Sequence, residues 1–286
     1  MKVLVTGGKG QLGSELKKIS TKNNEIEWFF TDRKSFNLSI LDNIYIFLDK
    51  LNPEIIVNCA AHTSVNCAED DFETSNITNH KAVELIASWC INNNCKLIHI
   101  STDYVYDGKS KFPYVETDLP NPLNNYGKSK LLGDIACLKK NPTCIIIRTS
   151  WLYSSFGDNF VTNIINLMKS NDEIRVVNDQ FGSPTYAGDL ADTILNIILN
   201  NKWYPGIYNY TNSANISWFD FANEIKSICD FNTIIKPIPS KSYPQKAKRP
   251  KYSILDNSKI INTFKIEQVN YLISLNKCIK ILYNES

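Results

Sequence analysis

The sequence predicts an α/β protein whose first half is a doubly wound parallel sheet and whose second half is a smaller, loop-rich lobe. Three observations predict this. Short runs of β-branched and aromatic residues recur along the first half, and amphipathic helical stripes lie between them. Both patterns loosen after about residue 150. Continuous apolar strands separated by helices indicate a parallel sheet that is covered on both faces.

The predicted elements of the first half alternate. Apolar runs of strand length occur at 2–7, 26–32, 54–61, 96–102 and 144–150. Apolar residues at helical spacing separate the first four of these runs, at 12–19, 40–51 and 83–90. This order is typical of the Rossmann-type fold, which binds its ligands at the carboxyl ends of the strands.

The second half contains fewer elements. Helices are predicted over 159–169 and 189–200, and Ser217 to Asp220 has the form of a capping box that opens a third helix. Pro-, Gly- and Tyr-rich connections join them. Loop-rich sequence of this kind, following a nucleotide-binding sheet, usually builds a substrate lobe.

The chain has 286 residues, enough for one large α/β unit or two modest domains. We expect a dinucleotide-binding domain over 1–150 and a mainly substrate-binding lobe over 151–286, which returns part of 170–200 to the sheet. No internal repeat or flexible linker is visible, so we expect the two halves to share one interface.

The composition excludes several function classes. Lys and Arg number 31 against 29 Asp and Glu, a net charge of +2 that indicates neither a nucleic-acid nor a membrane partner. No run approaches the ~20 apolar residues of a membrane-spanning helix, and the first residues lack the apolar core of a signal peptide. The eight cysteines are scattered without zinc-ligand spacing. We therefore expect reduced thiols and a cytoplasmic protein.

A glycine-rich turn between the first strand and the first helix predicts a dinucleotide site. Gly7 permits the tight turn, Gly10 lets the backbone approach a pyrophosphate, and Gly13 lets the helix pack closely on the strand. Asp32 ends the second strand and is placed to bind a ribose hydroxyl, while Arg33 beside it could accept a 2′-phosphate. The alternative is that Asp32 and Arg33 are ordinary turn residues.

Tyr126 and Lys130 form a Y-x-x-x-K pair, which places them on one face of a helix as i, i+4 neighbours. An ammonium beside a phenol favours the phenolate and brings a pKa near ~10 within reach of neutral pH. Such a tyrosine can serve as general acid toward a carbonyl oxygen when hydride arrives at its carbon. The spacing is common by chance, so the pair predicts a reductase only together with the dinucleotide turn.

The segment Ser101 to Tyr106 lies at the carboxyl end of the fourth predicted strand, where a doubly wound sheet presents its site. Thr102 offers a hydroxyl that can position a substrate oxygen, and Asp103 offers a carboxylate. The alternative is that these residues only cap the strand and start the following turn. The small residues after Asn58, at the end of the third strand, can lie against the coenzyme.

Seven motifs occur in order along nearly the whole chain: GxxGQLGxEL (7–16), AAHTxVxxAE (60–69), STDYVYDG (101–108), PLNxYGKSK (122–130), RTSWLY (148–153), NDQxGSPTY (178–186) and RPKYS (249–253). Together they resemble the extended short-chain dehydrogenase/reductases and, most closely, the dTDP-4-dehydrorhamnose reductase family. The resemblance implies reduction of a dTDP-sugar by NADP(H), with NAD(H) as the alternative coenzyme.

The resemblance also implies a role for each matching residue. The catalytic set would be Thr102, Tyr126 and Lys130. The coenzyme would be bound by residues at the ends of the first three strands, namely Gly7, Gly10, Gln11, Leu12, Gly13, Asp32, Arg33, Asn37, Leu38, Ala61, His62 and Thr63, together with Tyr126 and Lys130. The sugar nucleotide would contact Thr102, Asp103, Tyr106 and Trp151. For Trp151 the alternative is a core aromatic.

The chain departs from the family pattern at two places. Asn37 stands where members commonly carry Asp near the adenine, which weakens that contact. Some members form dimers around magnesium through three glutamates; Glu15 and Glu285 match two of these positions, but the third is Gly188, with Asp189 adjacent. The sequence therefore predicts no metal site, and Mg²⁺ and a homodimer stay as alternatives that the resemblance allows.

Arg249 is a candidate substrate residue in the basic run KAKRPK (246–251) of the second half. A dTDP-sugar carries a diphosphate that needs cationic donors on the substrate side, and the planar fork of an arginine binds phosphate oxygens in pairs. The alternative is a solvated basic loop.

The predicted function is reduction of the C4 ketone of dTDP-4-dehydrorhamnose to give dTDP-L-rhamnose for cell-surface polysaccharide synthesis. The alternatives are a non-catalytic dinucleotide-binding regulatory subunit and another nucleotide-sugar reductase or epimerase. The intact set of Thr102, Tyr126 and Lys130 argues against a regulatory subunit, which has no chemical reason to keep it. Dehydration is not expected, because Tyr104 follows Asp103 where dehydratases of the superfamily place a second acidic residue.

Overall fold

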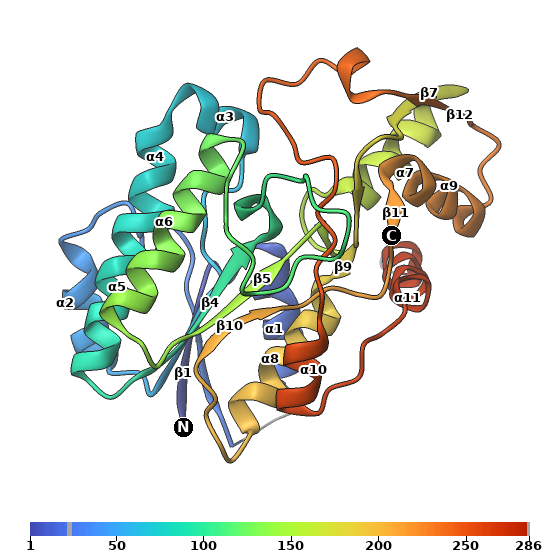
Figure 1. Cartoon of the computed structure of the whole chain (residues 1–286). Helices are drawn as coiled ribbons and strands as arrows, with labels where there is room; N and C mark the ends of the chain where they lie inside the picture. Colours follow the sequence, from blue (N-terminus) through green and yellow to red (C-terminus); the bar gives the residue numbers. More distant parts are fainter. Residues whose placement is uncertain (22–24, 285–286) are drawn as a thin grey trace.

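A computed structural model describes residues 1–21 and 25–284, and its centre is a six-stranded sheet (Figure 1). In spatial order the strands are β10 (Gly206–Asn209), β5 (Ile145–Thr149), β4 (Lys96–Thr102), β3 (Ile55–Asn58), β1 (Lys2–Thr6) and β2 (Glu27–Phe30). Every neighbouring pair in this sheet is parallel. Strands β1 to β5 lie within the five predicted ranges, so the doubly wound parallel sheet is confirmed.

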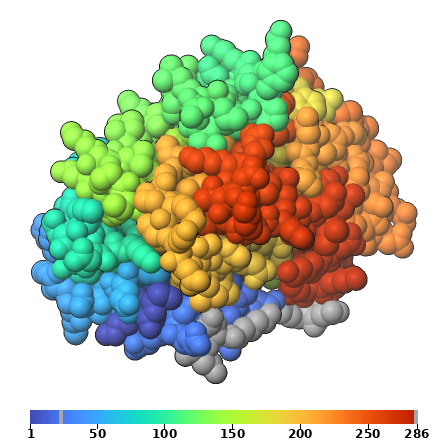
Figure 2. Space-filling model, turned by 60° about the horizontal axis from the view of Figure 1, so that its bottom comes forward, coloured from blue at the N-terminus to red at the C-terminus, as the bar shows by residue number. Residues whose placement is uncertain are grey.

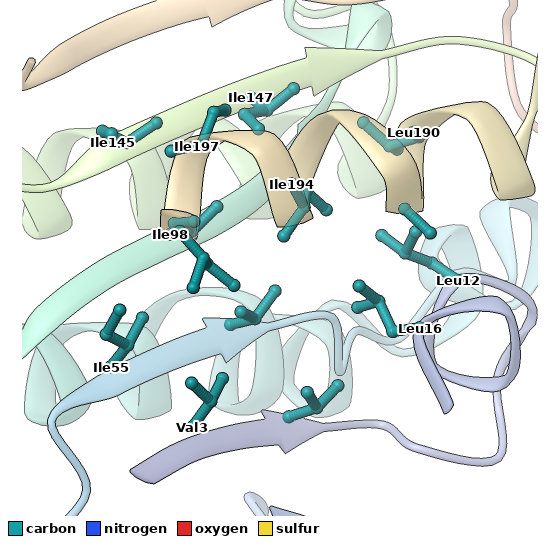
Figure 3. Packing of buried hydrophobic residues seen from close by; sticks show 14 of the residues in the cluster. Val3, Leu12, Leu16, Ile55, Ile98, Ile145, Ile147, Leu190, Ile194 and Ile197 are labelled. Carbon is teal, nitrogen blue, oxygen red and sulfur yellow. The ribbon is translucent and has the colours of Figure 1, made fainter. Parts of the chain in front are cut away.

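Helices cover both faces of the sheet. One face packs on α1 (Gln11–Ser20) and α8 (Ala187–Leu199), where Leu16 and Ile194 meet Val3 in one buried cluster (Figure 3). The other face packs on α2 (Asn43–Leu51), α5 (Ala82–Asn92) and α6 (Asn125–Lys140). Successive strand residues point to opposite faces, so Val3 and Leu4 belong to different clusters.

Helix α2 begins later than the apolar stripe over 40–51 predicts. Ile40 precedes it and is 47% exposed. The Asn37 side chain accepts hydrogen bonds from the backbone N–H and the hydroxyl of Ser39, at 3.0 and 2.8 Å. A local turn stabilised by an Asn side chain therefore delays the helix.

A separate hydrophobic cluster lies in the C-terminal lobe. Helices α7 (Phe160–Ser170), α9 (Trp218–Cys229) and α11 (Tyr271–Asn284) pack around the parallel pair β7 (Glu173–Val177) and β12 (Ile234–Ile238). The predicted capping box opens α9: Ser217 Oγ accepts from the Asp220 N–H at 3.1 Å, and the Asp220 carboxylate accepts from the Ser217 N–H at 2.9 Å.

The chain crosses between the two lobes several times. Within the range 170–200, α8 returns to cover the sheet, but β7 pairs with β12 in the C-terminal lobe. The strand that extends the sheet is β10, which lies beyond this range and pairs with β5. The C-terminal segment also comes back, since Leu255 bridges to Tyr114. In Figure 2 its orange-red surface lies directly against the green and yellow-orange surfaces of earlier segments.

Short elements complete the described chain: α3 (Val65–Asp70), α4 (Phe72–Asn76), the π-helix η1 (Ile77–Lys81), the 3-10 turns η2 (Asp103–Val105) and η3 (Ser240–Ser242), α10 (Ser258–Phe264), and the paired strands β6 (Leu152–Tyr153) with β9 (Thr185–Tyr186) and β8 (Phe181–Gly182) with β11 (Ile216–Ser217). No helix within the described ranges has the length and apolar character needed to cross a membrane.

Candidate active site

The glycine-rich turn follows β1 and leads into α1. Gly7 has a left-handed backbone, φ +68°, and a Cβ there would lie 2.9 Å from the Ala60 backbone. A Cβ at Gly13 would lie 2.3 Å from the Gly7 carbonyl oxygen. Both glycines are therefore needed for the turn to lie against α1 and the segment after β3. Gly10 caps α1 without a side-chain hydrogen bond, so the free N–H groups of the helix face the turn, as a phosphate site requires.

Asp32 lies beyond β2, beside the same turn. Its carboxylate forms an ion pair with Lys9 at 2.5 Å and accepts hydrogen bonds from the backbone N–H groups of Lys34 and Ser35, each at 2.9 Å. These contacts, that with Lys9 foremost, hold the pKa of Asp32 well below its usual range. Arg33 is exposed beside it. The predicted ribose residue is thus an ionised group paired with Lys9.

The other predicted coenzyme residues fall into two groups. Leu12 and Leu38 are buried in the two clusters that cover the sheet, so their side chains belong to the core. The rest lie at the carboxyl edge of the sheet: Gln11, Asn37, Ala61 and His62 are partly buried, and Thr63 is exposed. Gln11 Oε1 is buried and has no hydrogen-bond partner within the described residues, so it can accept from a ligand.

Asn79 holds the segment after β3 in place and was not predicted. Its Oδ1 accepts from the His62 N–H at 2.8 Å, and its Nδ2 donates to the His62 carbonyl and to Ser129 Oγ, each at 3.0 Å. A Cβ at Gly133 would lie 2.1 Å from the Asn79 carbonyl oxygen, so α6 packs tightly against η1. π-Helical turns are frequent at functional sites. No motif marks Asn79, because its contacts come from two segments that are distant in the sequence, the one after β3 and α6.

Thr102 and Tyr126 meet where β4 ends and α6 begins. Thr102 Oγ1 caps η2 by accepting from the Tyr104 N–H at 3.2 Å, and it lies within hydrogen-bonding reach of the Tyr126 hydroxyl. A Cβ at Gly127 would lie 2.2 Å from the Tyr104 carbonyl oxygen, so the first turn of α6 is pressed against η2. Asn124 caps α6 by accepting from the Gly127 N–H at 2.8 Å. The two hydroxyls are thus held by rigid elements.

Lys130 lies one turn further along α6 and is 2% exposed. Its Nζ donates to the Ile100 carbonyl at 2.6 Å and lies 3.4 Å from His99 Nε2. Burial lowers the pKa of Lys130 to about 8. Burial also raises the pKa of Tyr126 above its usual value, against an opposing hydrogen bond from Thr102. The direction of the expected pKa shift at Tyr126 is therefore wrong for this state: desolvation is the largest effect, and Tyr126 is a neutral phenol.

Asp103 and Tyr106 are placed differently by η2. Asp103 is buried, accepts from Thr102 Oγ1 at 3.1 Å, and burial raises its pKa to about 7. Tyr106 is fully buried; its hydroxyl donates to the Val115 carbonyl at 3.0 Å and accepts from Arg148 at 2.8 Å. The structure therefore puts Tyr106 in the core rather than in the predicted substrate site, because both hydrogen-bonding functions of its hydroxyl are used internally.

Trp151 lies just beyond β5 with a φ of +47°, a left-handed backbone that bulky residues rarely adopt. Its ring stacks on that of Trp218, the first residue of α9, with centroids 3.4 Å apart and planes at 8°. A Cβ at Gly182 would lie 2.4 Å from the Trp151 ring. Trp151 is thus held between α9 and β8 and stays partly buried. Trp218 was not predicted, since a capping box indicates a helix start and not a stacking partner.

Arg249 reaches the site from the C-terminal loop. The residues on both sides of Arg249 are held in place. Asn124 Nδ2 donates to the Lys248 carbonyl at 2.8 Å, and a Cβ at Gly108 would lie 2.6 Å from Pro250 Cβ. Burial raises the pKa of Tyr104 to about 12 against the opposing charge of Arg249, which therefore lies near that phenol. Arg249 is partly buried, and its Nε is buried with no hydrogen-bond partner in the described ranges. It lies at the edge of the site and not on a freely solvated loop.

A chain of buried polar side chains crosses the sheet beneath Lys130. Asn58 Nδ2, at the end of β3, lies 3.0 Å from His99 Nδ1 on β4. His99 Nε2 lies 3.9 Å from Asp134 Oδ1 on α6, and Arg148 Nε on β5 donates to Asp134 Oδ2 at 3.2 Å. All of these residues are at most 2% exposed. None was predicted, because a polar residue within an apolar run has no assignable partner in a single sequence.

The residues at the family's magnesium positions do not fit a metal site. Glu15 is buried, accepts from Ser154 Oγ at 2.6 Å, and is hydrogen-bonded by the Tyr186 side chain. A Cβ at Gly188 would lie 2.4 Å from the Tyr186 ring, so a glutamate does not fit at this position unless that ring moves. Glu285 lies outside the described residues. Within 1–21 and 25–284, no group of three or more His, Cys, Asp or Glu residues could hold a metal ion.

A parallel sheet with a glycine-rich turn after β1, and a tyrosine–lysine pair beside the end of β4, define a nicotinamide-dependent oxidoreductase of the short-chain dehydrogenase/reductase class. The chain belongs to the RmlD substrate binding domain family, which matches residues 1–284. The predicted resemblance to the dTDP-4-dehydrorhamnose reductases is thereby confirmed.

Curated relatives and solved structures agree. The dTDP-4-dehydrorhamnose reductase of Aggregatibacter actinomycetemcomitans is 37% identical over 93% of this chain and 94% of its own length. A structure of a reductase of that name from Clostridium acetobutylicum has a TM-score of 0.95 at 36% identity and covers 99% of this chain and 100% of that one. Another from Bacillus anthracis, in complex with NADP, has a TM-score of 0.92 at 33% identity. It covers 98% of this chain and 99% of its own. A Thermus thermophilus UDP-glucose 4-epimerase, 17% identical, shares the fold alone.

Proposed function

We propose that this chain reduces the C4 ketone of dTDP-4-dehydrorhamnose with NADPH to give dTDP-L-rhamnose, a precursor for cell-surface polysaccharide. The observation that carries the proposal is the meeting of Thr102, Tyr126 and Lys130 at the edge of the sheet that also holds the glycine-rich turn. The full-length match to reductases with this activity in their name supports the choice of substrate.

Tyr126 is the proton donor in this mechanism. The bound nicotinamide supplies a hydride to C4, and the oxygen on C4 then takes a proton. Burial keeps Tyr126 protonated at neutral pH, which is the form that a general acid needs. Thr102 can hold the same oxygen, because it lies beside the phenol. Lys130, one turn away, stabilises the negative charge that the phenol carries after the proton has left.

The coenzyme residues of this proposal are those of the turn and of the neighbouring strand ends. The N-terminus of α1 takes the pyrophosphate, with Leu12 and Leu38 contributing backbone contacts only. Lys9 pairs with Asp32, whereas Arg33 is exposed beside it and can accept the 2′-phosphate of NADP(H). Lys130 takes the nicotinamide ribose. The NADP complex of the Bacillus anthracis relative supports this choice of coenzyme.

The substrate side of the proposal comes mainly from 151–286, with 1–150 as the dinucleotide-binding domain. Trp151 and Arg249 hold the sugar nucleotide, and Asp103 contacts the sugar near Tyr126. The unpartnered Nε of Arg249 is a donor that a diphosphate oxygen can accept. We place the reaction in the cytoplasm, since all eight cysteines are free thiols, which suits a reducing compartment.

The test is the oxidation of NADPH, followed by absorbance, with dTDP-4-dehydrorhamnose as substrate. We expect one dTDP-L-rhamnose, identified by NMR, for each NADPH consumed. The Escherichia coli reductase, 32% identical, is the positive control. No turnover under conditions where that enzyme works would contradict the proposal. A reduced sugar with the other configuration at C4 would assign a different nucleotide-sugar reductase.

A further inference from the structure

The buried cluster beneath the site contains two cations and one carboxylate. Lys130, Asp134 and Arg148 are each at most 2% exposed. Ionised side chains are almost never buried to this extent unless they are paired. Arg148 Nε donates to Asp134 Oδ2, and the Ser101 side chain also hydrogen-bonds to this carboxylate, whose Oδ1 lies 3.9 Å from His99 Nε2. The second oxygen of this carboxylate thus points toward the side of the cluster that holds Lys130.

The hydrogen-bond directions identify the tautomer of His99. Thr6 Oγ1 accepts a backbone N–H from the segment after β3 at 3.1 Å and therefore gives its own proton to Asn58 Oδ1, at 2.6 Å. This leaves Asn58 Nδ2, a donor, facing His99 Nδ1, which must accept. Burial and the charge of Lys130 hold the pKa of His99 well below its usual value, so the ring is neutral. Its single proton is then on Nε2.

A proton on Nε2 makes His99 a donor toward Asp134 and prevents it from accepting from Lys130. Lys130 Nζ and His99 Nε2 lie 3.4 Å apart, but no hydrogen bond between them stabilises the ammonium. The acceptor of Lys130 among the described residues is the Ile100 carbonyl, which is neutral. The compensating charge has to come from Asp134.

We propose that Asp134 is a positioning residue for the reduction: together with His99 and Arg148 it keeps Lys130 charged and directed toward the coenzyme. The proposal rests on the proposed function, in which Lys130 holds the nicotinamide ribose. Asp134 itself touches neither coenzyme nor substrate, because it lies behind Lys130 on the buried face of α6.

Few other groups can set the charge of Lys130. The titratable or charged groups around it are Tyr126, Asp134 and Cys137 on α6, Cys59 after β3, His99 on β4, and Arg148 on β5 beyond Asp134. Burial raises the pKa of Tyr126, so it is neutral. Burial raises the pKa of the Cys59 thiol. A hydrogen bond with Cys144, with burial adding to its effect, raises the pKa of the Cys137 thiol, so both thiols are neutral. Asp134 is the one carboxylate in this set. Burial raises its pKa, and the charges of Arg148 and Lys130 oppose that rise and favour its ionised form.

The test is NADPH affinity, measured by fluorescence from about pH 6 to about pH 10, for the full chain and its Asp134→Asn variant. Wild type should lose affinity as Lys130 deprotonates. In Asp134→Asn this loss should begin about one pH unit lower or more, the usual effect of removing a nearby opposite charge, with roughly 10-fold weaker binding near pH 8. Asp134→Glu keeps the charge and should restore the wild-type profile.

Asp189→Asn is the matched control. Asp189 is a buried carboxylate on α8 that accepts from Asn212 at 2.8 Å and from Ser274. Its loss should lower the melting temperature and leave the pH profile of NADPH binding in place. A wild-type profile for Asp134→Asn, or an equal shift in Asp189→Asn, would overturn the proposal.

If Asp134→Asn does not fold, Arg148→Met decides. It removes the cation that pairs with Asp134 and keeps this buried carboxylate ionised, so the loss of NADPH affinity should move to lower pH, as in Asp134→Asn. An unmoved or raised profile would overturn the proposal. The binding assay contains no sugar nucleotide. An enzyme that binds NADPH with this pH dependence but does not reduce dTDP-4-dehydrorhamnose would therefore refute the proposed function and leave the role of Asp134 intact.

Discussion

The proposed catalytic side of the site and the proposed substrate side are built in different ways. Thr102, Tyr126 and Lys130 come from β4 and α6, which belong to the sheet and to a helix packed on it. Trp151 and Arg249 come from connections in the C-terminal lobe, where the strands nearest Trp151 are only two residues long. Reacting groups need rigid elements, whereas substrate recognition is commonly placed on loops held by a scaffold.

From this difference we expect each region to control a different kinetic constant. A change on the catalytic side alters a group that acts in the transition state, so it should lower kcat. A change on the substrate side removes binding that is equal in the ground and transition states, so it should raise KM. The following variants test whether kcat and KM are controlled by different regions of the site.

Tyr126→Phe should have the largest effect. It removes one hydroxyl, the proton donor, and should lower kcat by ~10²-fold or more while the affinity for NADPH stays nearly unchanged. Steady-state kinetics and fluorescence titration measure the two quantities. Tyr104→Phe is the control, because it also removes one phenolic hydroxyl. The ring of Tyr104 packs edge-on against that of Tyr126, with the ring centroids 5.7 Å apart. An equal loss in both variants would remove Tyr126 from its assigned role.

Arg249→Ala should act on the other side of the division. We expect KM for the sugar nucleotide to rise roughly 10-fold or more, since a charged hydrogen bond is worth ~1.5–3 kcal/mol, while KM for NADPH is unchanged. The measurement belongs at low ionic strength, where the contact is strongest. Lys251→Ala, an exposed cation two residues further on, is the control. An unchanged KM in Arg249→Ala would show that Arg249 does not bind the sugar nucleotide.

Trp218→Leu tests whether the stacked pair supports Trp151. Loss of an aromatic pair costs ~0.5–1.5 kcal/mol, so KM for the sugar nucleotide should rise roughly 2- to 10-fold with little change in kcat. Trp203→Leu is the control, because Trp203 is also partly buried but donates to the Thr143 carbonyl beside β10. A fall in kcat without a change in KM would place Trp218 on the catalytic side instead.

The smallest effect concerns the pH dependence of stability at Asp103. Burial raises its pKa to about 7, whereas the unfolded chain ionises it near ~4. As pH rises from about 4 to about 7 the unfolded state alone loses this proton, so the folded state loses stability. Asp103→Asn should therefore show a flatter fall in melting temperature across that range, by about 2 °C or more. Parallel curves for the two proteins would contradict the assigned environment of Asp103.

Much of the fold could be predicted from local pattern. The strands β1 to β5 lie within apolar runs, and the capping box at Ser217 is made by residues three positions apart. Strand β10 was missed because Gly206–Asn209 is short and only half apolar; its place depends on the edge that β5 leaves open. The π-helical turn at Asn79 likewise depends on contacts with α6 that sequence spacing does not contain.

Neighbouring side chains of the candidate site could be predicted where a single motif fixes the spacing between them. The i, i+4 spacing of Tyr126 and Lys130 is such a case. The direction of the pKa shift at Tyr126 was wrong, because desolvation depends on what covers the residue. Tyr106 was misplaced for a similar reason: η2 turns it into the core, although it is only four residues from Thr102. The buried charges at Asp134 and Arg148 were missed because each is recognised only through its partner.

The place of β10 has a consequence for how the chain folds during synthesis. When residue 150 has been made, five strands exist, but α8 does not yet cover Ile98 and Ile147 on one face, and β5 is an open edge. Such a sheet exposes apolar surface and unpaired backbone, both of which promote aggregation. The nascent chain therefore has to wait until residue 209 has left the ribosome before its first domain can close. The boundary proposed at residue 150 between the two binding tasks is therefore not a boundary between independently folding units.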